Sequence, residues 1–172
     1  MKIPVIFSTI TGNAFRLAEA AAAGLDEPLG PYNIRYVTDE MIGLFDTFVL
    51  SYWCNRGTAD DDTIALIKKM RGKNLIVVGT LGAEADGKHA ADVRARVAAL
   101  ASENNSLLAH YLCRGSIDLN RTAQRLKSPE GEKGHLSPER FEKQKQSLGH
   151  PDGGELAACT EAVRAAAARL NV

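Results

Sequence analysis

The stretch Ser8-Thr9-Ile10-Thr11-Gly12-Asn13 stands between an apolar segment, Ile3 to Phe7, and an alanine-rich segment that begins at Ala14. This order predicts a strand, a hydroxyl-rich turn and the start of a helix. The first N–H groups of a helix have no intrahelical partner and carry partial positive charge, so the turn predicts an anion site. It contains no Lys or Arg, and the P-loop pattern of nucleotide triphosphate sites is absent. These features favour one phosphate monoester as the ligand.

The same residues permit a simpler interpretation, in which Thr11 or Asn13 only caps the helix. The position of the turn in the chain favours the ligand site instead. The first strand–helix turn is a preferred ligand position in doubly wound sheets.

The composition is typical of a globular protein, and at 172 residues we expect a single domain over 1–172. The formal net charge is zero, which argues against a nucleic-acid or membrane-surface partner. Three distant cysteines without C-x-x-C spacing indicate a reducing compartment and argue against zinc or iron–sulfur sites. No window resembles a signal-peptide core or a transmembrane helix. We therefore expect a soluble, cytoplasmic protein.

Strands and helices are predicted to alternate along the chain. The predicted strands are 3–7, 34–37, 47–52, 75–78 and 107–112. The predicted helices are 14–25, 61–70, 90–101 and 155–170, with a short helical turn within 39–46. Such alternation gives an α/β fold of three layers, a five-stranded parallel sheet of order 2-1-3-4-5 with helices on both faces. The ligand should contact the loops after the first and third strands, and then the loop after the fourth.

The segment from about 120 to 153 departs from this alternation, because it is polar and carries three prolines. Residues 121–150 hold seven Lys or Arg and four Glu, a net charge of +3. Ser137-Pro138-Glu139-Arg140 predicts one short helix there. We interpret the segment as a surface excursion, either a solvated charged face or a basic surface for an acidic partner.

Two further loops carry ligand-binding features. The only Trp of the chain, Trp53, follows the third predicted strand and is well placed to stack on a flat ring, or alternatively packs inward. Gly57 lets the backbone approach a ligand closely. The loop 79–89 has three glycines that expose backbone groups to the edge of a heterocycle, or else it is a plain connection with a turn at Asp86-Gly87.

Together these segments resemble the flavodoxin family, which binds FMN at this switch point. Phe7 to Asn13 is similar to the family's phosphate loop, and Trp53 with 57–60 is similar to the loop on one face of the isoalloxazine. Residues 79–90 resemble the loop on the other side, and 149–152 resemble a subset of bacterial flavodoxin-like proteins. Three features depart from the family. Ala14 stands where a Thr is usual, and the loop 79–90 lacks an aromatic residue. The chain is also neutral, whereas many flavodoxins are acidic.

The resemblance implies an FMN electron carrier that passes one or two electrons to a redox protein partner, with no catalytic side chain and no metal. The implied cofactor-binding residues are Ser8, Thr9, Ile10, Thr11, Gly12, Asn13, Ala14, Trp53, Cys54, Asn55, Arg56, Gly57, Thr58, Thr80, Leu81, Gly82, Ala83 and Ala85. Arg56 either stabilises the reduced, anionic flavin or points into solvent. Two alternatives are an FMN-dependent reductase, or its flavin subunit, acting on a quinone or tetrapyrrole, and a flavin-free binding module.

Overall fold

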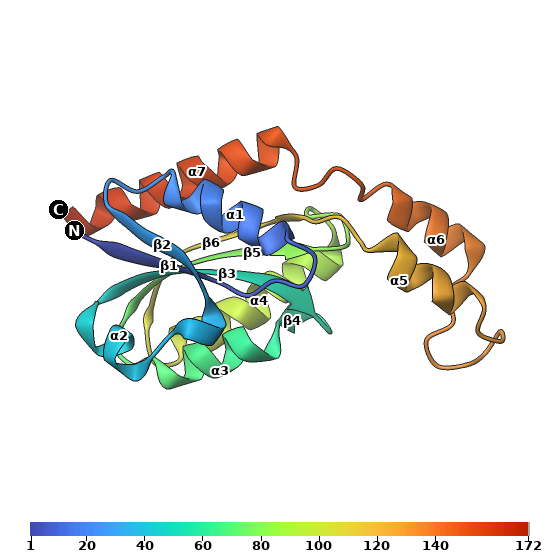
Figure 1. Ribbon diagram of the computed structural model, residues 1–172, viewed down its shortest axis with the longest axis horizontal. Helices are drawn as coiled ribbons and strands as arrows, with labels where there is room; N and C mark the ends of the chain where they lie inside the picture. Colours follow the sequence, from blue (N-terminus) through green and yellow to red (C-terminus); the bar gives the residue numbers. More distant parts are fainter. Residues whose placement is uncertain (172) are drawn as a thin grey trace.

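A parallel sheet runs through the middle of the molecule in the computed structural model, which describes residues 1–171 (Figure 1). Its parallel strands are β1 (Ile3–Phe7), β2 (Pro28–Asn33), β3 (Thr47–Asn55), β5 (Asn74–Leu81) and β6 (Ser106–Arg114), in the order β2-β1-β3-β5-β6. Without the short β4 this is the predicted 2-1-3-4-5 order. The predicted α/β fold is therefore confirmed.

The sixth strand comes from a hairpin that the sequence did not predict. β3 continues beyond Tyr52 and turns back into β4 (Thr58–Ala59), with Cys54 opposite Ala59. The two turn residues, Arg56 and Gly57, have φ of 50° and 82°. Positive φ at both positions matches the twist of a two-residue hairpin.

The second strand was predicted in the wrong place. The segment 34–37 contains a 3-10 turn, η1 (Ile34–Tyr36), and the strand is the preceding segment, Pro28–Asn33. β2 pairs only with β1 and alternates between exposed and half-buried residues, so it needs no continuous apolar run. Its two prolines are tolerated because one edge of the strand is free.

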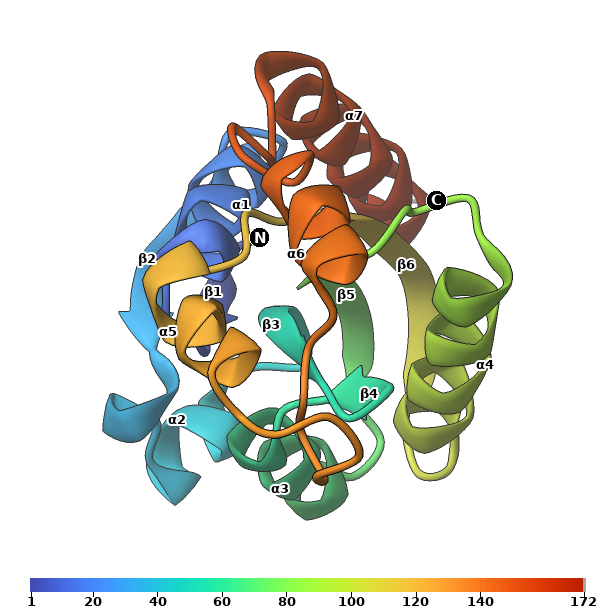
Figure 2. The ribbon, with the colours of Figure 1, turned by 90° about the vertical axis from the view of Figure 1, so that its right-hand side faces the viewer.

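Helices cover both faces of the sheet, as Figures 1 and 2 show. α1 (Asn13–Ala22) and α7 (Gly153–Ala168) lie on one face, where Val5, Val49 and Val163 are buried together. α2 (Asp39–Leu44), α3 (Asp61–Lys69) and α4 (Lys88–Ser102) lie on the other, over Leu50 and Val77. Because both faces are covered, the central strands are apolar without alternation. The predicted helices are confirmed to within a few residues, and a 3-10 turn, η3 (Arg169–Asn171), follows α7.

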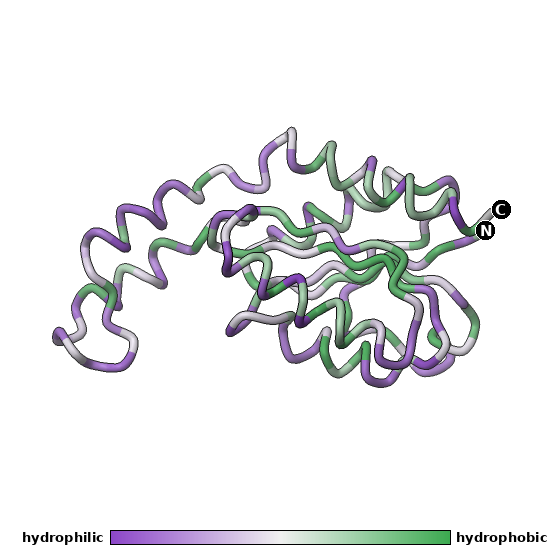
Figure 3. Tube along the Cα trace, turned by 180° about the vertical axis from the view of Figure 1, so that it is seen from behind, coloured by the Kyte–Doolittle hydropathy of each residue, from purple (hydrophilic) through white to green (hydrophobic). Residues whose placement is uncertain are grey.

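The segment after β6 projects beyond the carboxyl ends of the strands and is mostly hydrophilic (Figures 1 and 3). The short helix predicted to begin at Ser137-Pro138 is confirmed, but the expectation of a single helix in this segment was wrong. The structure has α5 (Leu119–Ala123), a 3-10 turn η2 (Gln124–Leu126) and α6 (Pro138–Lys145). α5 forms because the Asp118 carboxylate accepts hydrogen bonds from the backbone N–H groups of Asn120 and Arg121. We call residues 119–145 the helical hairpin. Across residues 1–171, no helix has both the length and the apolar character needed to cross a membrane.

Candidate functional site

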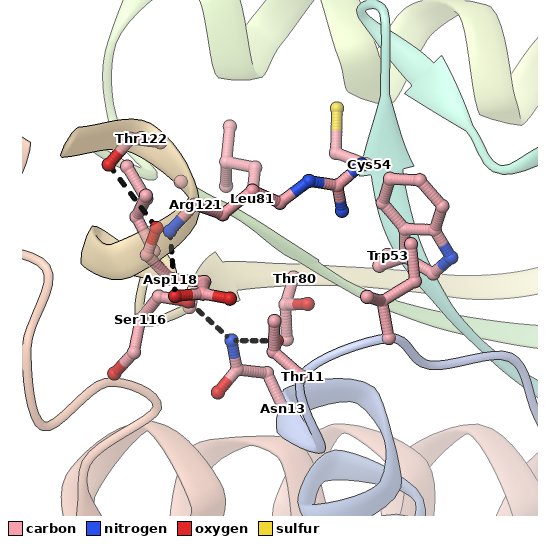
Figure 4. A pocket seen from close by; sticks show the side chains of 14 residues that line it. Thr11, Asn13, Trp53, Cys54, Thr80, Leu81, Ser116, Asp118, Arg121 and Thr122 are labelled. Carbon is pink, nitrogen blue, oxygen red and sulfur yellow. Dashed lines mark hydrogen bonds between the residues drawn. The ribbon is translucent and has the colours of Figure 1, made fainter. Parts of the chain in front are cut away.

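A cavity of about 210 Å³ lies at the carboxyl edge of the sheet, where β1, β3 and β5 end (Figure 4). Predicted site residues that line it are Ile10, Thr11, Asn13, Trp53, Cys54, Thr80, Leu81 and Gly82. The remaining lining residues follow β6 and are Gly115, Ser116, Ile117, Asp118, Arg121 and Thr122. We call this space the edge cavity. It brings together the three loops that the sequence singled out.

The first turn of α1 borders the edge cavity and is left uncapped. Its N-cap residue is Gly12, at φ 90°, and no side chain bonds to the first N–H groups of the helix. Thr9 Oγ1 instead accepts a hydrogen bond from Gly12 N–H at 3.0 Å. Within residues 1–171, the N–H groups of Asn13, Ala14 and Phe15 have no hydrogen-bond partner. The simpler interpretation, in which Thr11 or Asn13 caps the helix, is therefore wrong.

Buried hydrogen bonds fix the turn before α1 to the neighbouring strand and helix. The Ser8 hydroxyl is buried and donates to Asp60 Oδ1 at 2.8 Å, and Asp60 also caps α3 through Thr63 N–H. The Ser51 hydroxyl donates to the Ala14 carbonyl at 2.7 Å, while the Ala14 side chain is fully buried. Ser8 and Ala14 thus hold the turn in place through buried contacts with the neighbouring elements.

Asn13 joins the turn to the segment after β6. Its Nδ2 donates to Thr11 Oγ1 at 3.1 Å and to the Ser116 carbonyl at 2.8 Å (Figure 4). Thr9 Oγ1 and Thr11 Oγ1 are the acceptors in their bonds, so both hydroxyl protons are free for another acceptor. The turn therefore offers both hydroxyl and backbone donors, and of the two hydroxyls that of Thr11 lies at the edge cavity.

Trp53 stands between two cavities. It lies in register with Thr80 of β5 and belongs to neither buried core cluster. One side borders the edge cavity, and the other borders a polar cavity of about 330 Å³ that Ser8, Thr9 and Asn55 also line. The indole therefore lines the site instead of packing inward.

Other predicted site residues lie outside the edge cavity. Arg56, Gly57 and Ala83 line a separate hollow, where Arg96 Nη1 donates to the Gly57 carbonyl at 2.8 Å. Thr58 pairs with Asn55 in the β3–β4 hairpin. Ala83 and Ala85 pack against the core cluster. Of the four cofactor-binding residues predicted within 81–85, Leu81 and Gly82 thus line the edge cavity.

Sequence reasoning missed the wall formed by 115–122. Ser116 N–H and its hydroxyl both donate to the His150 carbonyl, at 2.8 Å and 2.7 Å, which holds this segment over the sheet edge. Only the position of these residues in the chain indicated a role at the site. They follow the fifth parallel strand, whose carboxyl end lies at the same edge of the sheet as those of the other strands. No ligand-binding pattern in 115–122 supplements that signal.

The reactive side chains do not form a second chemical centre. Burial raises the pKa of the Cys54 thiol and raises the pKa of Cys159 to about 12, so neither is an activated thiolate.

In residues 1–171, one group, His150 with Asp152 and Glu155, has the spacing of metal ligands. His150 Nδ1 bonds to Glu155 Oε2 at 2.7 Å, and Asp152 and Glu155 form the capping box of α7. This group therefore holds the start of a helix.

The fold and the edge cavity define a doubly wound α/β protein with its site at the topological switch point. The family model described as "Flavodoxin domain" matches residues 4–164, so the chain belongs to the flavodoxin family. The predicted family is thereby confirmed.

Individual relatives agree with this family. Over 164 residues the chain is 25% identical to the flavodoxin-like domain-containing protein BilS of Clostridioides difficile (strain CD3), covering 91% of this chain and 90% of the relative. Among solved structures, a flavodoxin from the domain Archaea superposes with a TM-score of 0.60 at 12% identity, covering all of both chains. Fusobacterium nucleatum flavodoxin bound to flavin mononucleotide gives 0.58 at 13% identity, covering 98% of each. These likenesses of structure show the fold.

Proposed function

We propose that the edge cavity binds FMN and that the protein carries electrons between redox partners. The observation that carries the proposal is the uncapped start of α1 beside Trp53 at the switch point of the sheet. An anion site and an aromatic surface together suit a ligand that has a phosphate at one end and a flat ring at the other.

The donors at the α1 start fit a phosphate monoester. Three backbone N–H groups, from Asn13 to Phe15, are unpaired within residues 1–171, and the Thr9 and Thr11 hydroxyls are free to donate. The first turn of α1 contains no acidic residue, so no neighbouring carboxylate of that turn repels an anion. Backbone donors take the place of the hydroxyl that Ala14 lacks.

The walls of the edge cavity fit a flat heterocycle. Ile10, Trp53 and Leu81 supply apolar surface, and the backbone at Gly82 and Gly115 lies close by. A Cβ at Gly115 would come 3.0 Å from Thr80 Cβ and 3.1 Å from Asn13 Nδ2, so glycine lets this wall lie close to β5 and to the start of α1. When bound, FMN would supply the electron chemistry, and the protein would bind it, orient it and set its charge environment.

A redox protein is the proposed partner. Residues 121–150 carry a net charge of +3 on a chain that is neutral as a whole, and the hairpin stands beside the edge cavity. An acidic partner docked there would lie next to the bound flavin. Replacing Lys143 and Lys145 with Glu should then slow electron transfer to an acidic partner severalfold at low salt. Equal rates in the variant and the native protein would exclude this docking surface.

The three free thiols support a reducing, cytoplasmic location as part of the same proposal.

The function is tested by loading stripped protein with FMN and following flavin fluorescence. We expect stoichiometric quenching, and a weaker quench in Trp53→Ala. Protein reduced with dithionite should then pass electrons to a cytochrome, without oxidising NAD(P)H on its own. Oxidation of NAD(P)H by the isolated protein would support the reductase alternative, and failure to bind FMN would support the flavin-free binding module.

A further inference from the structure

The helical hairpin brings one arginine to the edge cavity. β6 ends at Arg114, Gly115 N–H donates to the Leu81 carbonyl at 2.8 Å, and Asp118 caps α5. This path places Arg121, the third residue of α5, at the edge cavity. Figure 4 shows its side chain extending from α5 across the cavity toward Trp53 and Cys54.

The guanidinium of Arg121 is uncommitted. Among residues 1–170 it forms neither an ion pair nor a hydrogen bond, although its backbone N–H bonds to Asp118. Nearby arginines are engaged: Arg94 with the Leu112 carbonyl, Arg96 with the Gly57 carbonyl, Arg114 with Glu84 and Arg125 with the Gly134 carbonyl. Arg121 is therefore available to a ligand.

The charges that line the edge cavity are Asp118 and Arg121. Asp118 Oδ1 accepts two backbone hydrogen bonds at 3.0 Å and 3.2 Å, and so serves the start of α5. Arg56, which the sequence suggested as the cation of the site, lines the separate hollow on the far side of Leu81. The cation of the edge cavity thus comes from the hairpin.

The chemistry of a bound flavin gives this cation a consequence. Two electrons from a reduced redox protein and one proton from solvent convert the neutral oxidised ring into a ring with one negative charge. A guanidinium a few ångströms away stabilises the anion and leaves the neutral ring nearly unaffected.

We propose that Arg121 stabilises the reduced form of the flavin and thereby raises the potential of this protein. The inference rests on the proposed FMN function. It also gives the hairpin a role at the cofactor, since the residue that sets the redox balance is carried by the segment proposed to dock the partner.

The test compares Arg121→Gln with Arg140→Gln, which removes the same charge from α6 of the same hairpin but lines none of the cavities described above. Each variant is loaded with FMN, and its midpoint potential and its affinity for oxidised FMN are measured. We expect Arg121→Gln to weaken binding of reduced relative to oxidised FMN about tenfold, which corresponds to a two-electron potential lower by about 30 mV. Arg121→Lys should restore most of the difference, and high salt should shrink it because the side chain is exposed.

Several results would overturn the inference. If Arg121→Gln and Arg140→Gln have the same potential, Arg121 has no redox role. If Arg121→Gln weakens both redox forms equally, the arginine only supports the cavity wall. If the native protein binds no FMN, the proposed function and this inference both fail, whereas binding with unchanged potentials refutes the inference alone.

Discussion

Helices α1 and α7 pack side by side on one face of the sheet, and their first turns are built in opposite ways (Figure 1). At α7, Asp152 accepts a hydrogen bond from Glu155 N–H, and Glu155 accepts one from Asp152 N–H, both at 2.8 Å. α1 begins at Gly12 with no capping side chain and no acidic residue. The closed start stabilises its helix. The open start lacks that stabilisation and leaves its N–H groups unpaired beside the edge cavity.

Closing the open start should have the largest effect. Thr11→Glu places a carboxylate one residue before the N-cap of α1, where it competes for the free N–H groups and repels phosphate. We expect FMN binding to weaken about 1,000-fold, or about 4 kcal/mol, because several hydrogen bonds to a charged group are lost. Thr11 is exposed, so the core stays intact. Fluorescence titration with FMN and with riboflavin checks this, and the affinity for riboflavin should stay nearly constant.

A matched control is Thr38→Asp at the start of α2. The Thr38 hydroxyl oxygen caps α2 by accepting from Met41 N–H, and Asp caps equally well. This variant adds a carboxylate to a helix start away from the cavity, and FMN affinity should be unchanged. If both variants bound FMN like the native protein, the open start of α1 would have no part in binding.

Acid should weaken the packing on the face of the sheet opposite α1 and α7, where Tyr52 is buried, without affecting the α1 donors, which do not titrate. Tyr52 and His110 are hydrogen-bonded at 2.9 Å, and burial lowers the pKa of His110 to about 4. The unfolded chain, with a His pKa of about 6.5, takes up a proton in this window that the folded chain does not. His110 therefore leaves the free energy of unfolding unaffected above about pH 6.5. As the pH drops to 4, its titration lowers the free energy of unfolding by about 3 kcal/mol.

Urea unfolding at pH 7 and pH 4 measures this loss. Carboxylates also titrate over part of this range, so the comparison is made with His110→Gln, which keeps a polar partner for Tyr52. The fall in unfolding free energy should be smaller in the variant by most of the His110 contribution. An identical fall in both proteins would show that His110 is not the titrating group.

Opening the closed start should have the smallest effect. Asp152→Ala removes the cap of α7 and should cost about 1 kcal/mol, a decrease in Tm of about 2–4 °C. Asp152→Ser should recover most of it, because Ser is also a good N-cap residue. Thermal unfolding gives the stability, and a parallel titration should give native FMN affinity. A large loss of FMN affinity in Asp152→Ala would mean that the two helix starts do not have separate roles.

The parts of the site that the sequence predicted have local signals. The turn from Ser8 to Asn13 and the segment after Tyr52 each follow a buried apolar run, so their place at the sheet edge follows from topology, although the second segment extends β3 instead of forming a loop. The open state of the α1 start could not be predicted, because Thr and Asn in the turn are also good capping residues. Only the observed bonds of Thr9 and Asn13 distinguish the two possibilities.

The missed parts depend on contacts made across the fold. β2 is an edge strand whose exposed face needs no apolar run, so its sequence does not resemble a buried strand. The wall at 115–122 is held by the carbonyl of His150, which is distant in sequence. In the sequence, Arg121 is one of several charged residues in the polar segment after β6, and nothing distinguishes it from the others. It reaches the edge cavity only because Asp118 caps helix α5.

The proposed function depends above all on phosphate binding at the open start of α1. The most direct measurement is the ratio of FMN to riboflavin affinity in the native protein, from fluorescence titration of stripped protein with each ligand. The two ligands share the same ring and differ in the phosphate. We predict that FMN binds at least about a hundredfold more tightly than riboflavin. Equal, weak binding of both would contradict the claim and leave α1 an ordinary helix with an uncapped end.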